Sequence, residues 1–239
     1  DGQVALKPAI KVSVDVRLEI EKGLRYVSRG GEKLERALQA FGQTDLTGWV
    51  CADLGASTGG FTDALLQHGA SKVYAIDVGH GLLHWKLRSD ARVVSMERTN
   101  ARFVDRLPEP VQLATVDASF ISLKILLPVV CGWFSDAGGE AIALIKPQFE
   151  AGRQDTAKGE GVIRDPGIHR QVLLDVLAFA QESGYGVKGL VRSPLVGPKG
   201  NAEFLVWLHC PGEKGGDQQV LVDRALAQVE GGGSATEPL

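Results

Sequence analysis

The chain has 239 residues, of which 44% are hydrophobic and 23% are charged, a composition typical of a globular protein. Its formal net charge of -3 argues mildly against a nucleic-acid binder that relies on a broad basic face. No apolar run approaches the ~20 residues that span a bilayer, and no basic segment followed by an apolar run predicts a signal peptide at the start.

The first residues predict short strands over 3–6, 11–14 and 17–20. A piece of two or three strands is only marginally stable by itself. We therefore interpret residues 1–24 as the remnant of a truncated small domain and a linker, with the main domain over 25–210.

From residue 32 onward, helical and strand patterns alternate along the chain. This alternation predicts an α/β fold, a doubly wound Rossmann-like sheet that is mostly parallel. The final two strands are joined without a helix, so we expect an antiparallel last strand, as in a methyltransferase-type sheet. The predicted helices cover 32–42, 61–68, 82–87, 123–134 and 166–183, and the predicted strands cover 49–54, 72–77, 92–96, 111–117, 140–146, 186–192 and 202–209.

Residues 211–239 predict a flexible tail that is rich in Gly, Glu and Gln. A short amphipathic helix fits between Asp217 and Glu230, with Val220, Leu221, Ala225 and Val229 on one side.

The segment Asp53-Leu-Gly-Ala-Ser-Thr-Gly-Gly-Phe-Thr-Asp63 follows a buried strand and leads into a helix. Glycine allows the backbone to approach a ligand closely, and ligands in such sheets lie beyond the carboxyl ends of the strands. The order of glycines is not the Gly-x-Gly-x-x-Gly of a dinucleotide site, and Asp53 suits the amino group of a methionine moiety better than a pyrophosphate. Asp77 ends the next strand, where it can accept hydrogen bonds from a ribose diol.

This loop predicts S-adenosylmethionine as the cofactor, in preference to NAD or to a turn without a ligand. The residues that we predict to bind it are Asp53, Gly55, Ser57, Gly59, Gly60, Phe61, Asp77, Asn100 and Asp117, of which Asn100 is assigned to the adenine edge.

Two lysines and two carboxylates are predicted at the same edge of the sheet. Asp117 and Lys146 close two strands, Glu203 begins the antiparallel last strand, and Lys33 opens the helix before the first strand. A ribose hydroxyl becomes a good nucleophile when a base removes its proton, and a lysine serves when burial or a neighbouring cation favours its neutral form. We assign Lys146 as the base, Lys33 as the neighbouring cation and an RNA contact, and the two carboxylates as groups that orient the lysines. A surface charge at an element end is the alternative for each residue.

Several motifs together resemble the TlyA branch of the FtsJ-like ribose 2'-O-methyltransferases, some of which have been labelled hemolysins. The motifs are Arg29-Gly-Gly-Glu-Lys-Leu, the loop from Asp53, Asp77-Val-Gly, His84-Trp-Lys-Leu-Arg, Asp117-Ala-Ser-Phe-Ile, Ile145-Lys-Pro-Gln-Phe-Glu and Gly200-Asn-Ala-Glu-Phe.

The resemblance covers roughly residues 25–208 and implies a catalytic tetrad of Lys33, Asp117, Lys146 and Glu203. It also implies methylation of cytidine in ribosomal RNA, with ribosomal RNA or ribosomal subunits as partners. Such proteins usually begin with a small RNA-binding domain, so residues 1–24 would be the final part of that module.

Cys51, Cys131 and Cys210 are far apart and lack metal-ligand spacing. We expect reduced thiols, no metal site and a cytoplasmic location, without a membrane partner. The sequence does not indicate how many copies of the chain assemble. The alternative functions are a membrane-active cytolysin, a non-catalytic RNA-binding protein and a methyltransferase that acts on a small molecule.

Overall fold

The computed structural model describes residues 13, 15, 23–152, 159–197, 199–213 and 215–228. Seven strands form one sheet in the order β3-β2-β1-β4-β5-β7-β6. All neighbouring pairs are parallel except the two that β7 makes, with β5 and with β6. The strands are β1 (Val50–Leu54), β2 (Lys72–Ile76), β3 (Val93–Met96), β4 (Leu113–Val116), β5 (Gly139–Ile145), β6 (Gly186–Arg192) and β7 (Phe204–Cys210).

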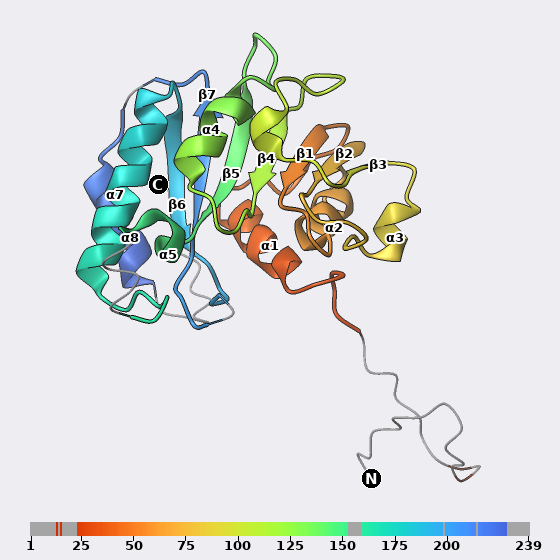
Figure 1. Cartoon of the computed structure of the whole chain (residues 1–239), viewed down its shortest axis with the longest axis horizontal. Coiled ribbons are helices and arrows are strands. Elements are labelled where there is room, and N and C mark those ends of the chain that lie inside the picture. The colour runs from red at the N-terminus through yellow and green to blue at the C-terminus, as the bar shows by residue number, and fades with distance from the viewer. Residues whose placement is uncertain are drawn as a thin grey trace.

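Helices cover both faces of this sheet (Figure 1). One face carries α1 (Gly30–Ala40), α2 (Gly60–Gln67) and α3 (Trp85–Arg88). The other carries α4 (Leu123–Cys131), α7 (Pro166–Glu182) and α8 (Gln218–Ala227), while α5 (Pro147–Glu150) and the 3-10 turn η1 (Ala101–Phe103) lie in loops. The prediction of a doubly wound, mostly parallel sheet with an antiparallel last strand is confirmed.

Each central strand supplies side chains to two separate hydrophobic cores. In β1, Ala52 and Leu54 pack with the α4 and α7 side, whereas Cys51 packs with the α1 and α2 side. Successive side chains of a strand point to opposite faces, so a strand buried on both faces is mostly apolar. This explains why the strand runs could be recognised in the sequence.

Several elements are shorter than the sequence predicts. The predicted helix over 82–87 begins only at Trp85, because the His84 ring accepts a hydrogen bond from the Lys86 amide and caps the helix. The predicted strand over 111–117 is shortened to Leu113–Val116. The strands predicted before residue 21 fall almost entirely on residues that the structure does not describe.

Helix α8 lies in the segment that was predicted as a flexible tail with a short helix. Its N-cap is Asp217, whose carboxylate accepts from the amides of Gln219 and Val220. Of the residues predicted on the apolar side, Ala225 is buried and Leu221 packs partly against the core, whereas Val220 is exposed and Val222, which was not predicted, is buried. The helix packs against α7 and β6 and therefore belongs to the folded domain.

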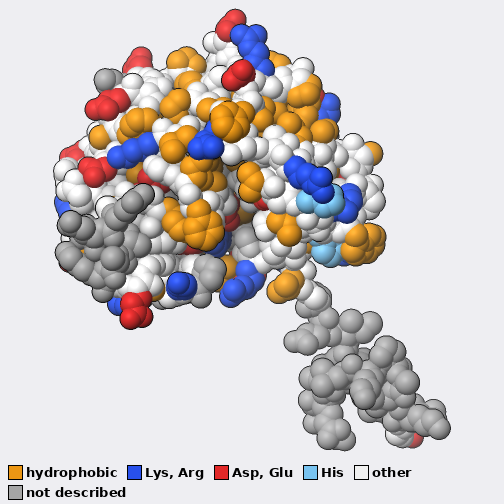
Figure 2. Space-filling model, viewed as in Figure 1, with side chains coloured by type: hydrophobic (Ala, Val, Ile, Leu, Met, Phe, Trp, Pro, Cys, Tyr) orange, Lys and Arg blue, Asp and Glu red, His pale blue; other side chains and the backbone are white. Residues whose placement is uncertain are grey.

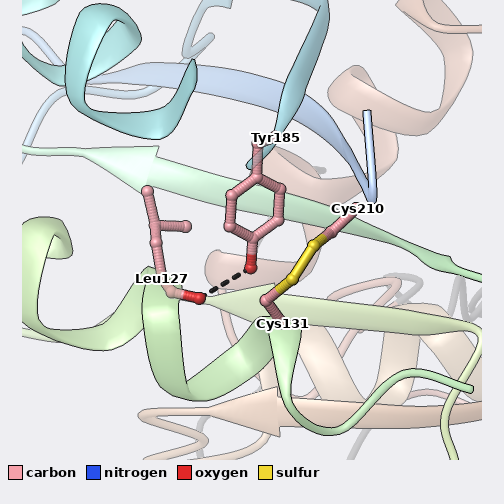
Figure 3. The surroundings of a disulfide bond; sticks show 4 residues. All are labelled: Leu127, Cys131, Tyr185 and Cys210. Carbon is pink, nitrogen blue, oxygen red and sulfur yellow. Dashed lines mark hydrogen bonds between the residues drawn. A yellow bond between two sulfur atoms is a disulfide. The ribbon is translucent and has the colours of Figure 1, made fainter. Parts of the chain in front are cut away.

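A disulfide joins Cys131, at the end of α4, to Cys210, at the end of β7 (Figure 3). The two Cα atoms lie 6.0 Å apart although 79 positions separate the residues in the chain. Next to the bond, the Tyr185 hydroxyl donates a 2.7 Å hydrogen bond to the Leu127 carbonyl. The expectation of reduced thiols is wrong for this pair, because α4 and β7 share one core. Cys51 is a buried free thiol.

We expect reduction of this disulfide to destabilise the domain. A cross-link between distant residues restricts the unfolded chain and is worth about 2–4 kcal/mol, which corresponds to a fall in Tm of roughly 5–15 °C for a domain of this size. Calorimetry with and without a reductant measures this difference. Cys210→Ser is the control, since its Tm should not respond to the reductant; an unchanged Tm in the natural sequence would contradict the prediction.

Candidate active site

Two adjoining clefts lie beyond the carboxyl ends of the parallel strands. The larger has a volume of about 660 Å³ and is lined by residues that follow β1, β2 and β4. The smaller, of about 260 Å³, lies between the start of α1 and the start of α2. Figure 2 shows a hollow near the middle of one face of the molecule, with hydrophobic side chains at its edge. Three predicted residues line both clefts, namely Gly55, Ser57 and Asp117.

Asp77 lies in the larger cleft and is held by the backbone. Its carboxylate accepts from the amide of Ser57 at 2.8 Å and from the amide of Gly79 at 2.7 Å. Asn100 also lines this cleft, and its side-chain oxygen accepts from the Arg102 amide at 3.2 Å. Both predicted ligand-binding side chains are thus fixed in position at the cleft wall.

The glycines of the loop have two different roles. Gly55 has a φ of +78°, and a Cβ there would lie 2.7 Å from the Asp117 carbonyl oxygen, so glycine lets the ends of β1 and β4 approach each other. Gly59 lines neither cleft. Its φ is +98°, and a Cβ would lie 2.2 Å from the Leu87 side chain, so it serves the packing of α2 against α3. Gly60 and Phe61 line the smaller cleft.

Asp53 occupies a different environment from the predicted one. It is fully buried and lines neither cleft. Its oxygens accept hydrogen bonds from the hydroxyls of Thr62, at 2.6 Å, and Thr115, at 3.1 Å. Burial outweighs these hydrogen bonds and raises the pKa of Asp53 to about 6. The side chain therefore ties β1, β4 and α2 together beneath the cofactor loop.

Lys146 and Asp117 form one of two ion pairs at this edge. Nζ of Lys146 lies 2.6 Å from Oδ1 of Asp117 and donates a 3.0 Å hydrogen bond to the hydroxyl of Ser119. Lys146 is only 7% exposed, and it stands directly between the end of β5 and the start of α5. An ammonium group so buried requires such partners.

Lys33 and Glu203 form the second ion pair, with 2.6 Å between Nζ and Oε2. Glu203 is 2% exposed and precedes β7, whereas Lys33 lies in the first turn of α1 and lines the smaller cleft. Because Asp117 lines the same cleft, the structure brings all four residues of the predicted tetrad to one place. Each lysine is paired with its own carboxylate.

Sequence reasoning missed three hydroxyl groups that hold the charged residues. Ser119 belongs to the motif Asp117-Ala-Ser-Phe-Ile, but no role was predicted for it. None was predicted for Thr62 or Thr115 either. Thr115 is the register partner of Asp53 between β4 and β1. A buried carboxylate needs donors from neighbouring strands, so the strand order would have indicated Thr115.

Comparisons with known proteins agree on one family. A family model described as FtsJ-like methyltransferase matches residues 26–210. The 16S/23S rRNA (cytidine-2'-O)-methyltransferase TlyA of Mycobacterium tuberculosis is 45% identical over 213 residues, covering 87% of this chain and 78% of that protein. Hemolysin A of Brachyspira hyodysenteriae is 41% identical, covering 86% and 85%. A solved structure from Lactococcus lactis, described as a hemolysin, has a TM-score of 0.77 at 46% identity and covers 84% of this chain and 98% of that one.

We predict that Asp53 makes stability depend on pH in a defined interval. Its folded-state pKa of about 6 exceeds the ordinary value of 3.8, so its extra stability is present below pH 3.8 and is lost as the pH rises through 6. Asp53→Asn should remove this loss, so the variant should gain about 3 kcal/mol relative to the natural protein across that interval. Urea unfolding at several pH values measures the difference.

The exposed substitution Asp136→Asn is the control and should leave the pH dependence unchanged. Parallel pH curves for Asp53→Asn and the natural protein would show that the Asp53 carboxyl is not responsible.

Proposed function

The chain belongs to the FtsJ-like methyltransferase family, and on that basis we propose that it transfers a methyl group from S-adenosylmethionine to a ribose 2'-hydroxyl of cytidine in ribosomal RNA. The resemblance inferred from the sequence motifs is confirmed by the family match. The observation that carries the proposal is the buried Lys146–Asp117 pair, in which Lys146 lies behind Asp117, a residue that lines both clefts.

The larger cleft fits the cofactor in size and in chemistry. A volume of about 660 Å³ falls within the range for small-molecule sites. Exposed apolar side chains such as Val78 and Ile125 offer a surface for adenine, and the Asp77 carboxylate can accept from a ribose diol. The amide groups at the start of α2, at Gly60 and Phe61, favour a carboxylate. When bound, S-adenosylmethionine supplies an electrophilic methyl group.

Lys146 is positioned to take the proton of the substrate hydroxyl. After Lys146 has released its own proton to solvent, Nζ accepts the proton of the hydroxyl, whose oxygen is thereby activated for attack on the methyl carbon. The resulting ammonium is stabilised by Asp117 at 2.6 Å and by the hydroxyl of Ser119. Lys33, which Glu203 holds at the wall of the smaller cleft, places a positive charge beside the reacting oxygen.

An exposed aromatic ring supports a nucleoside as the substrate. Phe120 is 90% exposed, has a left-handed φ of 63°, and lines the larger cleft one residue after Ser119. Its ring lies 5.0 Å from that of Phe149. RNA methylation requires an accessible nucleoside, and unstacked bases pack on such rings.

The relatives support ribosomal RNA as the substrate class, since TlyA of M. tuberculosis is named as a 16S/23S rRNA methyltransferase. A ribosomal substrate would place this protein in the cytoplasm, where ribosomes are assembled. None of the helices in the described part of the chain is long and apolar enough to cross a bilayer.

The direct test is methyl transfer from labelled S-adenosylmethionine to isolated ribosomal subunits, to free ribosomal RNA and to small hydroxyl compounds. We expect label in ribosomal RNA, at the 2'-oxygen of a cytidine when the modified ribose is mapped. Transfer to small molecules alone would favour the small-molecule methyltransferase, and leakage of lipid vesicles without any methyl transfer would favour the cytolysin.

We predict that Lys146→Ala lowers methyl transfer by about 10²–10⁴-fold, the usual contribution of a positioned base. Binding of S-adenosylhomocysteine, measured by calorimetry, should stay nearly unchanged, because Lys146 lines neither cleft. Lys146→Arg should also fail, since a guanidinium does not release its proton under these conditions.

Near-normal turnover by Lys146→Arg would show that Lys146 is not the base. A thermal melt of both variants is the control for folding, because either change disturbs a buried ion pair.

A further inference from the structure

The Glu150 carboxylate makes two hydrogen bonds to the start of α4. Oε2 accepts from the hydroxyl of Ser122 at 2.6 Å, and Oε1 accepts from the amide of Leu123 at 2.7 Å. Glu150 is the last residue of α5, four positions after Lys146. Within the part of the chain that the structure describes, no lysine or arginine forms an ion pair with it. In the described structure this carboxylate therefore bonds to the start of α4.

The start of α4 is well suited to receive a carboxylate. The first amides of a helix lack partners within the helix, and the helix dipole favours a negative charge there. Ser122 is the N-cap and accepts from the Lys124 amide, so its hydroxyl donates to Glu150 and accepts from the helix at once. Glu150 thus completes the cap and fixes where α4 begins.

The same two chain segments are joined a second time at the ion pair. Residues 117–122 form the loop between β4 and α4, which we call the Asp117 loop, and residues 146–150 follow β5. At one end Lys146 contacts Asp117 and Ser119. In the middle the Phe120 and Phe149 rings lie 5.0 Å apart. At the α4 end of the loop, the Glu150 carboxylate accepts from Ser122 and Leu123.

The Asp117 loop is anchored where the Asp117 amide donates to the Leu54 carbonyl and where Ala118 and Ile121 pack against the core, but Ser119 and Phe120 between them are exposed. Phe120 also holds a left-handed backbone conformation that costs energy in a non-glycine residue. The loop also supplies one wall of the larger cleft. Without the Glu150 contact, the loop would be held to the Lys146 segment mainly at the buried ion pair, and the Asp117–Lys146 distance would be less well defined.

From these contacts we propose that Glu150 is a positioning residue for methyl transfer, which holds the Asp117 loop against the Lys146 segment. The inference rests on the proposed function for its catalytic meaning. Loss of the Glu150 carboxylate frees the far end of the loop, and the Asp117 and Ser119 contacts to Lys146 loosen with it. A displacement of about 1 Å at reacting groups can cost up to 10²-fold in rate.

The variants Glu150→Gln, Ser122→Ala and their combination test this inference. We expect Glu150→Gln to lower kcat by roughly 10–100-fold with a smaller change in KM, and to move the midpoint of the pH–rate profile. Ser122→Ala added to Glu150→Gln should lower kcat little further, because both changes remove the Ser122–Glu150 hydrogen bond; the loss of the Ser122 cap should appear instead as a lower Tm. Glu182→Gln, at the exposed end of α7, is the matched control and should leave kcat and the pH profile unchanged.

Hydrogen exchange of the segment 117–124 gives a readout that needs no substrate. Exchange should become faster in Glu150→Gln and stay the same in Glu182→Gln. Unchanged exchange would overturn the proposal whatever the activity, and so would an unchanged kcat in a variant whose loop exchanges faster. Absence of RNA methylation by the natural protein would instead refute the proposed function.

Discussion

Lys146 and Asp117 meet because β4 and β5 are neighbouring parallel strands that end at the same edge of the sheet. The other residues of the site come together because their strands begin or end at the same edge. The cofactor loop follows β1 and Asp77 follows β2, both at the same level. Glu203 precedes β7, and because β7 runs antiparallel, its start lies where the other strands end. Residues that are 170 positions apart, Lys33 and Glu203, are thereby brought into contact.

The fold and the convergence of Lys33, Asp117, Lys146 and Glu203 could be predicted from the sequence, whereas the pairing of these four residues could not. Apolar strands and acidic strand ends are local signals, so Asp77, Asp117 and Lys146 could be placed at one edge. Which lysine contacts which carboxylate depends on the strand order. The burial of Asp53 depends on Thr62 and Thr115, and the Cys131–Cys210 bond on the packing of α4 against β7. These contacts join segments whose proximity no local pattern reveals.

The pairing also affects how RNA would be attracted to the site. Two lysines and two carboxylates give the tetrad no net charge when all four are ionised, in a chain whose formal net charge is -3. Attraction to phosphates depends on unpaired cations, and each phosphate contact adds to the affinity. Under the proposed function the tetrad acts at one hydroxyl, and affinity for a long RNA has to come from other residues. Phe120 adds a contact that does not depend on charge.

The place of β7 between β5 and β6 has a consequence for synthesis of the chain. The ribosome makes β6 before β7, yet in the described sheet β6 pairs with β7. A nascent chain that has passed β5 already holds the segments that line the larger cleft, and Lys33 has emerged long before its carboxylate partner. In the folded sheet β7 lies between β5 and β6, and this position brings Glu203 to Lys33. The segments that line the larger cleft are thus synthesised before the last member of the tetrad.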